Sequence, residues 1–141
     1  MAGVRATAAL VGLHYLVNLA HGVAHGGVPV PLTPFQTAFV VIVVGFGPLV
    51  GVWLSRSDRP TLAWGSLAAV LAAGFVFGVA FHYVIASPDH VANVPAGSWK
   101  LPFEGTAALV ALVDGGGALV AAWFWMQTRR FQPTTLTDST T

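Results

Sequence analysis

Four polar side chains occur in one apolar stretch near the start of the chain: His14, Asn18, His21 and His25. At 100° per residue, an α-helix places all four within about 60° of its circumference. A spanning helix turns such a face toward its neighbours, because polar groups are costly in hydrocarbon. Imidazole nitrogens bind zinc, copper and iron, and two histidines one turn apart can share a single ion. The spacing therefore predicts a buried polar stripe, with His21 and His25 as candidate metal ligands.

The third apolar stretch offers a partner for that pair. His82 follows Gly74 and Gly78 at intervals of four residues. One helix face would then carry the imidazole together with two residues small enough for close helix contact. With antiparallel neighbouring helices, His82 should lie at about the depth of His25. We therefore expect His82 to be a third ligand.

Further candidate ligands follow in Ser87-Pro-Asp-His-Val91. Pro88 should end the helix and turn the chain back over the mouth of the bundle. Asp89 and His90 would then supply a fourth ligand or support the others, and Gln36 reaches the same level. The expected cofactor is a transition metal (Zn, Cu or Fe) near the outer membrane face. Its predicted ligand set is His21, His25, His82, His90 and Asp89.

A second polar layer is predicted deeper in the membrane. Asp114 lies about eleven residues into the last apolar stretch, level with Asn18. A carboxylate at the centre of a bilayer costs about 2.5–3.5 kcal/mol on insertion scales, so it needs a partner. We expect that partner to be Asn18, His14 or His21. The three glycines after Asp114 weaken the helix, with a kink as one outcome, and let a neighbouring helix or a cofactor approach closely.

Other functions are consistent with the same residues. Haem b bound by two histidines from facing helices would make an electron-transfer protein, although the i, i+4 pair and the single outer cation, Lys100, fit haem poorly. A proton or ion relay, or a transporter, would use His14, Asn18, His21 and Asp114. An accessory or assembly subunit of a membrane complex would use these side chains only for helix packing.

Enzyme activity is the weaker expectation. The chain has no His-Glu-x-x-His, no Gly-x-Ser-x-Gly and no phosphate loop. Five dispersed histidines also fall short of the larger ligand sets that two-metal sites use. If the protein is an enzyme, a membrane oxidoreductase fits best, and no catalytic residue is assigned.

Composition identifies the class of protein that must position these residues. Of 141 residues, 55% are hydrophobic and 8% are charged, whereas about 25% are charged in soluble domains. Helices satisfy their own backbone in lipid, and the alternating segments of a barrel are missing, which indicates a helical membrane protein. The absence of cysteine excludes thiolate metal sites and iron–sulfur clusters. A net charge of +1 predicts no nucleic-acid partner.

Four apolar runs are each long enough to cross a hydrocarbon core of about 30 Å. We expect an all-α membrane protein with one domain, residues 1–130, whose four transmembrane helices form an up-down bundle. Their predicted ranges are about 7–28, 35–54, 61–85 and 103–126. Residues 131–141, rich in Thr, Ser and Asp, are expected to form a disordered polar tail.

The basic residues predict the orientation, because loops rich in Lys and Arg stay in the cytoplasm. Five arginines fall on one side of the predicted bundle, and only Lys100 falls on the other. The arginines are Arg5, Arg56, Arg59, Arg129 and Arg130. Both termini are therefore predicted to be cytoplasmic, in a multi-pass protein of the cell membrane. The expected partners are the lipid bilayer and a second copy of the chain or a larger membrane complex.

Three motifs resemble those of small, uncharacterised four-helix membrane proteins that are rich in histidine. They are His21-Gly-Val-Ala-His25, Val28-Pro-Val-Pro-Leu-Thr-Pro-Phe-Gln36, and Phe81-His82 with Pro88-Asp-His-Val91. The resemblance covers about two-thirds of the chain. It implies a four-helix topology and, since that group has no assigned activity, no chemistry.

Overall fold

The computed structural model describes residues 2–130, which form helices joined by loops. The elements are α1 (Ala2–Gly27), α2 (Pro34–Phe39), the π-helix η1 (Val40–Phe46), α3 (Gly47–Arg56), α4 (Pro60–Val79), the π-helix η2 (Ala80–Val84), the short 3-10 helix η3 (Val91–Asn93) and α5 (Lys100–Arg130). The polar tail predicted at 131–141 lies outside the described residues.

Four of the described helical segments are long and apolar enough to cross a membrane. They are Gly3–Gly27, Pro34–Arg56, Pro60–Val84 and Lys100–Arg130. The predicted runs fall on these segments, but the last helix starts earlier and ends later than 103–126, because its flanking polar residues continue the helix beyond the apolar stretch. Large apolar side chains face outward, including Leu16, Leu112 and Leu119, which are 67%, 71% and 75% exposed. An apolar exterior of this kind is what lipid requires.

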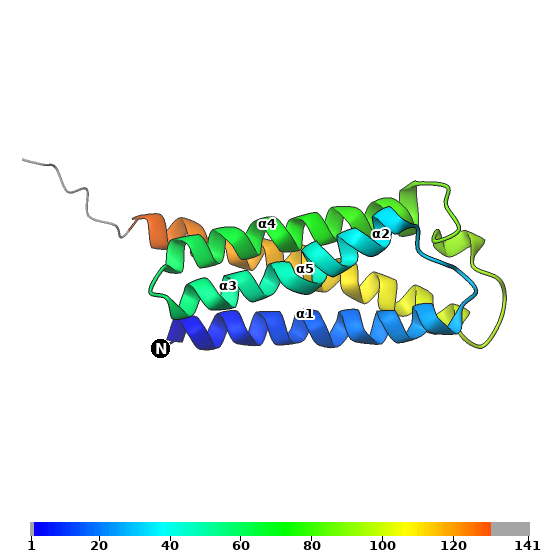
Figure 1. Ribbon diagram of the computed structural model, residues 1–141, viewed down its shortest axis with the longest axis horizontal. Helices are drawn as coiled ribbons and strands as arrows, with labels where there is room; N and C mark the ends of the chain where they lie inside the picture. The colour runs from blue at the N-terminus through cyan, green and yellow to red at the C-terminus, as the bar shows by residue number, and fades with distance from the viewer. Residues whose placement is uncertain (1, 131–141) are drawn as a thin grey trace, which may run out of the picture.

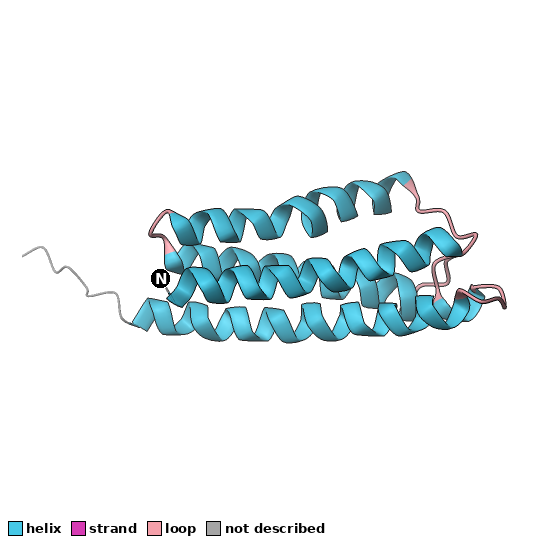
Figure 2. Cartoon of the chain, turned by 90° about the horizontal axis from the view of Figure 1, so that it is seen from below, coloured by secondary structure: helices cyan, strands magenta, loops and turns pink. Residues whose placement is uncertain are grey.

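The four segments lie side by side along one long axis (Figure 1). The short connection 57–59 and the start of α1 lie at one end of the bundle, and the connections 28–33 and 85–99 lie at the other (Figure 1). We call the latter the two-loop end. Turning the bundle by 90° shows the same long helices joined by loops only at their ends (Figure 2).

A proline explains why the second membrane segment is not a regular α-helix. Pro48 lacks an N–H group, so the carbonyl of Val44 has no donor four residues later. The helix widens in η1, where the N–H of Gly47 bonds to the carbonyl of Ile42, a separation of five residues. The Val44 carbonyl is thereby left free to accept a hydrogen bond from another helix.

Two apolar clusters close the bundle at its ends. At the two-loop end, Ala24, Val28, Val30 and Val94 pack around Phe103, which is fully buried. At the opposite end, the cluster consists of Val11, Trp64, Leu67 and Ala121. Phe103 also contacts His21, His25 and His82, so the first apolar cluster adjoins the polar residues predicted from the sequence.

Candidate functional site

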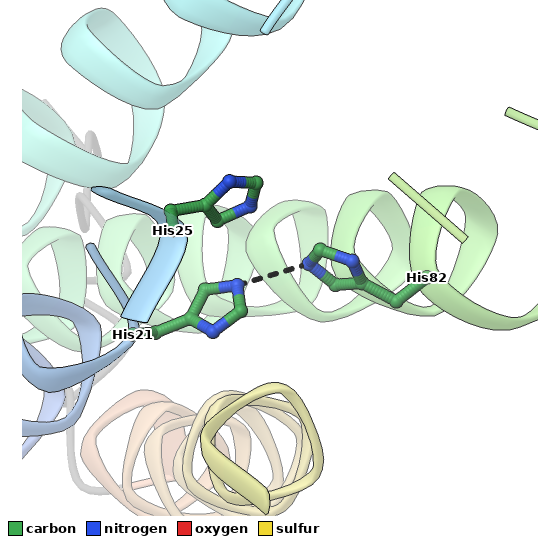
Figure 3. A group of neighbouring side chains, drawn as sticks. All are labelled: His21, His25 and His82. Atoms are coloured by element: carbon green, nitrogen blue, oxygen red, sulfur yellow. Dashed lines mark hydrogen bonds between the residues drawn. The ribbon is translucent and has the colours of Figure 1, made fainter. Parts of the chain in front are cut away.

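Three imidazoles meet near the two-loop end of the bundle. His21 and His25 come from α1 and His82 comes from η2, and the rings point toward one another (Figure 3). Each offers one nitrogen to a group whose members all lie within 4.8 Å of one another. The Nε2 atoms of His21 and His82 are 3.1 Å apart. We call these three residues the histidine cluster.

The hydrogen bonds behind His82 fix the protonation of its ring. Its Nδ1 lies 2.9 Å from the backbone carbonyl of Asp89. A carbonyl oxygen only accepts, so Nδ1 carries the hydrogen and donates it. In the neutral ring, Nε2 then carries a lone pair, and this is the atom that faces His21.

The same reasoning applies to His21. Its Nδ1 lies 3.0 Å from the hydroxyl oxygen of Thr106. That hydroxyl donates its single hydrogen to backbone carbonyls of its own helix, chiefly Pro102 at 2.7 Å. The Thr106 oxygen therefore accepts from Nδ1, and the Nε2 of a neutral His21 also carries a lone pair. Two lone pairs facing each other at 3.1 Å repel unless a cation lies between them.

Asp89 adds a buried carboxylate to the cluster. It is 3% exposed, and its Oδ1 lies 3.0 Å from Nε2 of His25. Although these atoms are close enough to pair, Oδ1 accepts no hydrogen bond. Burial alone would raise the pKa of Asp89, but the neighbouring His25 and His82 outweigh it, so the pKa lies below its ordinary value. The group is a carboxylate with one oxygen left unsatisfied.

The N-terminus of α2 orients a polar side chain toward that carboxylate. Thr33 and Gln36 form a capping box, in which the Gln36 side-chain oxygen accepts from the Thr33 N–H at 2.8 Å. The amide nitrogen of Gln36 is therefore turned the other way and donates to Oδ2 of Asp89 at 3.4 Å. The prediction that Gln36 reaches the level of the cluster is confirmed.

Apolar and backbone contacts hold the histidine cluster in place. The ring of Phe103 lies 4.8–5.4 Å from the centroids of all three imidazoles. The Lys100 ammonium donates to the carbonyls of Val91 and Val94, both at 3.0 Å, which ties the loop 85–99 to the start of α5. The helix ends before Pro88, as its position in the sequence predicted, and the loop that follows places Asp89 in the interior of the bundle.

The structure does not bring His90 into the histidine cluster. Its Nδ1 accepts a hydrogen bond from the N–H of Ala92 at 3.1 Å and so caps η3. Of the two residues after Pro88, the carboxylate lies at the cluster and the imidazole does not.

A second polar site lies deeper along α1. Nδ1 of His14 is 2.6 Å from Oδ1 of Asp114, and both residues are almost completely buried. The other ring nitrogen lies 3.1 Å from the free carbonyl of Val44 and donates to it. Asn18 bonds to the His14 carbonyl and lies 3.2 Å from its Nδ1. The partner predicted for Asp114 is confirmed as His14, and we call His14 and Asp114 the buried pair.

One proton is sufficient for the buried pair. Because Nε2 of His14 donates to Val44, the contact with Asp114 contains either an imidazolium and a carboxylate or a neutral imidazole and a carboxylic acid. The pair is electrically neutral overall in both forms, which reduces the cost of placing it in the middle of a membrane. In both forms Oδ2 of Asp114 is an acceptor, and it has no hydrogen-bond partner.

One cavity of about 430 Å³ connects the two polar sites. The histidine cluster and Asp89 line one part, and Asn18 and Asp114 line another. Gly74 and Gly78 were both expected at a close helix contact. A Cβ on Gly74 would indeed lie 2.8 Å from Oδ2 of Asp114, but a Cβ on Gly78 would meet nothing within 4 Å. Gly78 therefore lines the cavity instead of packing against a neighbouring helix.

The glycines after Asp114 allow close packing without interrupting α5, so the helix is not broken there. A Cβ on Gly115 would lie 2.9 Å from the ring of Phe75, and one on Gly117 would lie 3.1 Å from Leu71. The close approach of neighbouring helices that the sequence predicted is therefore present at two of the three glycines.

Two contributors to these sites were missed from the sequence. Thr106 is one of several hydroxyl residues in helices, and nothing in the sequence distinguishes it from the others. Tyr15, whose hydroxyl donates to the carbonyl of Gly45 in η1, resembles any aromatic residue in an apolar helix. Pro48 did carry a signal, because a proline within a membrane helix always frees a carbonyl.

The chain matches no protein-family model, no curated protein and no solved structure. Its resemblance to small four-helix membrane proteins stays a prediction. Function is therefore inferred from the geometry of the histidine cluster, the buried pair and the cavity between them.

Proposed function

We propose that the protein is a multi-pass membrane protein that binds a transition metal ion, Zn, Cu or Fe, through the histidine cluster. The observation that carries this proposal is the facing pair of Nε2 atoms of His21 and His82, 3.1 Å apart, with both rings protonated on the opposite nitrogen. A cation bound between the two nitrogens attracts both lone pairs, so their mutual repulsion is outweighed.

The distances suit a single small ion. Two nitrogens bound to one tetrahedral zinc at about 2.0–2.1 Å each lie roughly 3.3–3.4 Å apart. The 3.1 Å between the Nε2 atoms of His21 and His82 is close to that value. His25 offers a third nitrogen, and the unsatisfied Oδ1 of Asp89 is a fourth donor or a compensating charge. Imidazole and carboxylate together favour zinc, copper or iron over calcium or magnesium.

The surroundings of the histidines also resemble those of metal ligands. Ligating histidines generally donate their second N–H to a carbonyl, a carboxylate or another acceptor, which fixes the ring and its tautomer. His82 donates to the Asp89 carbonyl and His21 donates to Thr106. A planar porphyrin would have to separate the two nitrogens, and 3.1 Å leaves no room for it. This spacing favours a single ion over haem.

We place the site near the outer face of the membrane. Arg5, Arg56, Arg59, Arg129 and Arg130 belong to the end opposite the two-loop end, and Lys100 belongs to the two-loop end. By the preference of basic residues for the cytoplasm, both chain termini then lie in the cytoplasm, and the two-loop end faces outward. The metal site would be accessible to metal ions from the outer side.

Metal analysis of the purified protein tests the proposal. Wild-type protein, as purified and after incubation with Zn²⁺, Cu²⁺ or Fe²⁺ followed by desalting, is expected to retain about one ion per chain. His82→Ala and His21→Ala should retain at most about a tenth as much, because each loses a nitrogen from the facing pair. His90→Ala is the matched control, since it removes an imidazole that caps η3 outside the cluster.

The outcomes separate the alternatives. Retention of the ion by wild type and His90→Ala, together with its loss from the two cluster variants, supports the proposal. Failure of the wild type to retain any of the three metals overturns it. The facing nitrogens would then share a proton, and the histidines would serve helix packing, as expected for an accessory subunit.

A further inference from the structure

The cavity contains one polar atom that the rest of the protein leaves without a partner. Oδ2 of Asp114 is buried and accepts no hydrogen bond, and Asp114 itself is fully buried. This oxygen lies beside Gly74, and both residues line the cavity. A buried acceptor without a donor is costly, so a ligand that supplies the donor gains free energy.

The walls of the cavity indicate what kind of ligand would bring that donor. Apart from the two polar sites, they consist largely of apolar side chains and glycines, including Leu19, Val40, Phe77 and Val110. The volume of about 430 Å³ lies in the usual range for small-molecule sites, roughly 300–1,000 Å³. A water molecule in such a site needs two to four polar partners, and the apolar walls beside Oδ2 provide few.

The polar site around Asp114 carries no net charge, so it has no strong preference for a cationic ligand. The buried pair is neutral in either of its protonation forms, so Oδ2 accepts a hydrogen bond without calling for a positive charge. An uncharged hydroxyl satisfies it. We propose that this cavity binds an apolar small molecule that carries a hydroxyl group, with the hydroxyl donating to Oδ2 of Asp114 and the hydrocarbon body lying against the apolar walls.

The bound molecule would extend toward the histidine cluster. His14 and His21 are seven residues apart on α1, which places the two polar sites about 10 Å apart along the helix. The same cavity is lined by His21 and His82. The inference goes beyond metal binding and does not depend on it, because Asp114 and the apolar walls supply the recognition.

Gly78 allows the cavity to be filled without disturbing the buried pair. A Cβ at this position meets nothing within 4 Å, so Gly78→Val places its methyl groups in open space inside the cavity. Gly116 is the matched control. It also has open space at Cβ, lies on α5 and is exposed on the outside of the bundle. Gly116→Val makes the same chemical change away from the cavity.

Photolabelling tests the proposal with a defined probe. Chelator-treated protein in lipid nanodiscs is exposed to a 4-alkylphenol that carries a diazirine in its chain, and the labelled residues are mapped by mass spectrometry. Labels are expected at cavity residues that lipid does not reach, such as Val110, which is 7% exposed, and at Phe77. Competition by 4-pentylphenol should be about tenfold or more stronger than competition by pentylbenzene, which lacks the hydroxyl. Gly78→Val should reduce labelling about tenfold, and Gly116→Val should leave it unchanged.

Two results would overturn the inference. Equal competition by the phenol and the hydrocarbon would show that no hydroxyl is recognised. Labelling that is spread over lipid-facing residues such as Leu112, or that is unaffected by Gly78→Val, would show that the probe lies in the bilayer and that the cavity holds water. Because the protein is treated with a chelator first, a negative photolabelling result does not bear on metal binding, which the metal analysis tests separately.

Discussion

The histidine cluster and the buried pair both depend on the same face of α1, but they satisfy their polar atoms differently. In the buried pair, an imidazole and a carboxyl group share a proton, and Val44 accepts the remaining N–H. In the histidine cluster, the facing Nε2 atoms of His21 and His82 both present lone pairs, and Oδ1 of Asp89 accepts nothing.

On the proposed function, this difference separates a structural interaction from a binding site. A buried acid and base complete each other, so their contact contributes to helix packing without any added component. In the histidine cluster, His25 lies within pairing distance of Asp89, but the facing lone pairs of neutral His21 and His82 have no proton between them. We therefore propose that a cation from outside the chain completes the histidine cluster, and the following experiments compare it with the buried pair.

The largest expected effect is a loss of folding stability when the buried pair is broken. Asp114→Ala leaves the Nδ1 of a fully buried His14 without its partner, and we expect the free energy of unfolding to fall by about 3–5 kcal/mol. His21→Ala in protein without metal should cost far less, since it removes one of two repelling lone pairs. Both are measured by unfolding in mixed detergent micelles with increasing dodecyl sulfate.

A double variant tests whether the pair is coupled. His14→Leu combined with Asp114→Leu should cost less than the sum of the two single changes, because neither partner is then left alone. Additive costs would contradict the interpretation of the pair as one unit.

The second-largest expected effect is stabilisation by zinc, which should occur only at the histidine cluster. Zn²⁺ at about one hundred times its dissociation constant should raise the free energy of unfolding of the wild type by about 2.7 kcal/mol. His90→Ala should gain the same amount and His82→Ala almost none. If His82→Ala is stabilised equally, zinc binds at another site.

The smallest effect concerns the residue behind His21. Thr106→Val keeps the side-chain shape but removes the oxygen that accepts from Nδ1, so the tautomer is no longer fixed. We expect metal affinity to weaken about tenfold, measured by competition with a chelating dye. Thr128→Val is the control, because the Thr128 hydroxyl likewise bonds to its own helix but lies outside the cluster. Equal affinities in both variants would show that Thr106 does not orient His21.

Much of the arrangement could be predicted from the residues themselves. The shared face of His14, Asn18 and His21 follows from helical periodicity, which depends only on neighbours along the chain. Two spans of similar length predicted that His82 lies near the depth of His25, and the structure brings both together with His21. The cost of a lone carboxylate in lipid predicted a partner for Asp114 among Asn18, His14 and His21, and the structure shows that it is His14.

The loop after the third segment was less predictable. Asp89 and His90 are adjacent and can both bind metals, so the sequence alone does not distinguish them. The contacts of Lys100 with Val91 and Val94, together with the burial of Val94, fix the backbone so that Asp89 lies inside. These contacts join residues from separate elements, and no local pattern reports them.

The sequence by itself determined the four apolar segments, the polar face of α1 and the proline that frees the Val44 carbonyl, because each depends on local periodicity or on the covalent structure of one residue. The tertiary structure alone decided that Thr106 accepts from His21, that the two Nε2 atoms face each other and that Gly78 lines a cavity. Those features depend on distances between helices of a few ångströms, and such distances are set by the packing of side chains from the whole bundle.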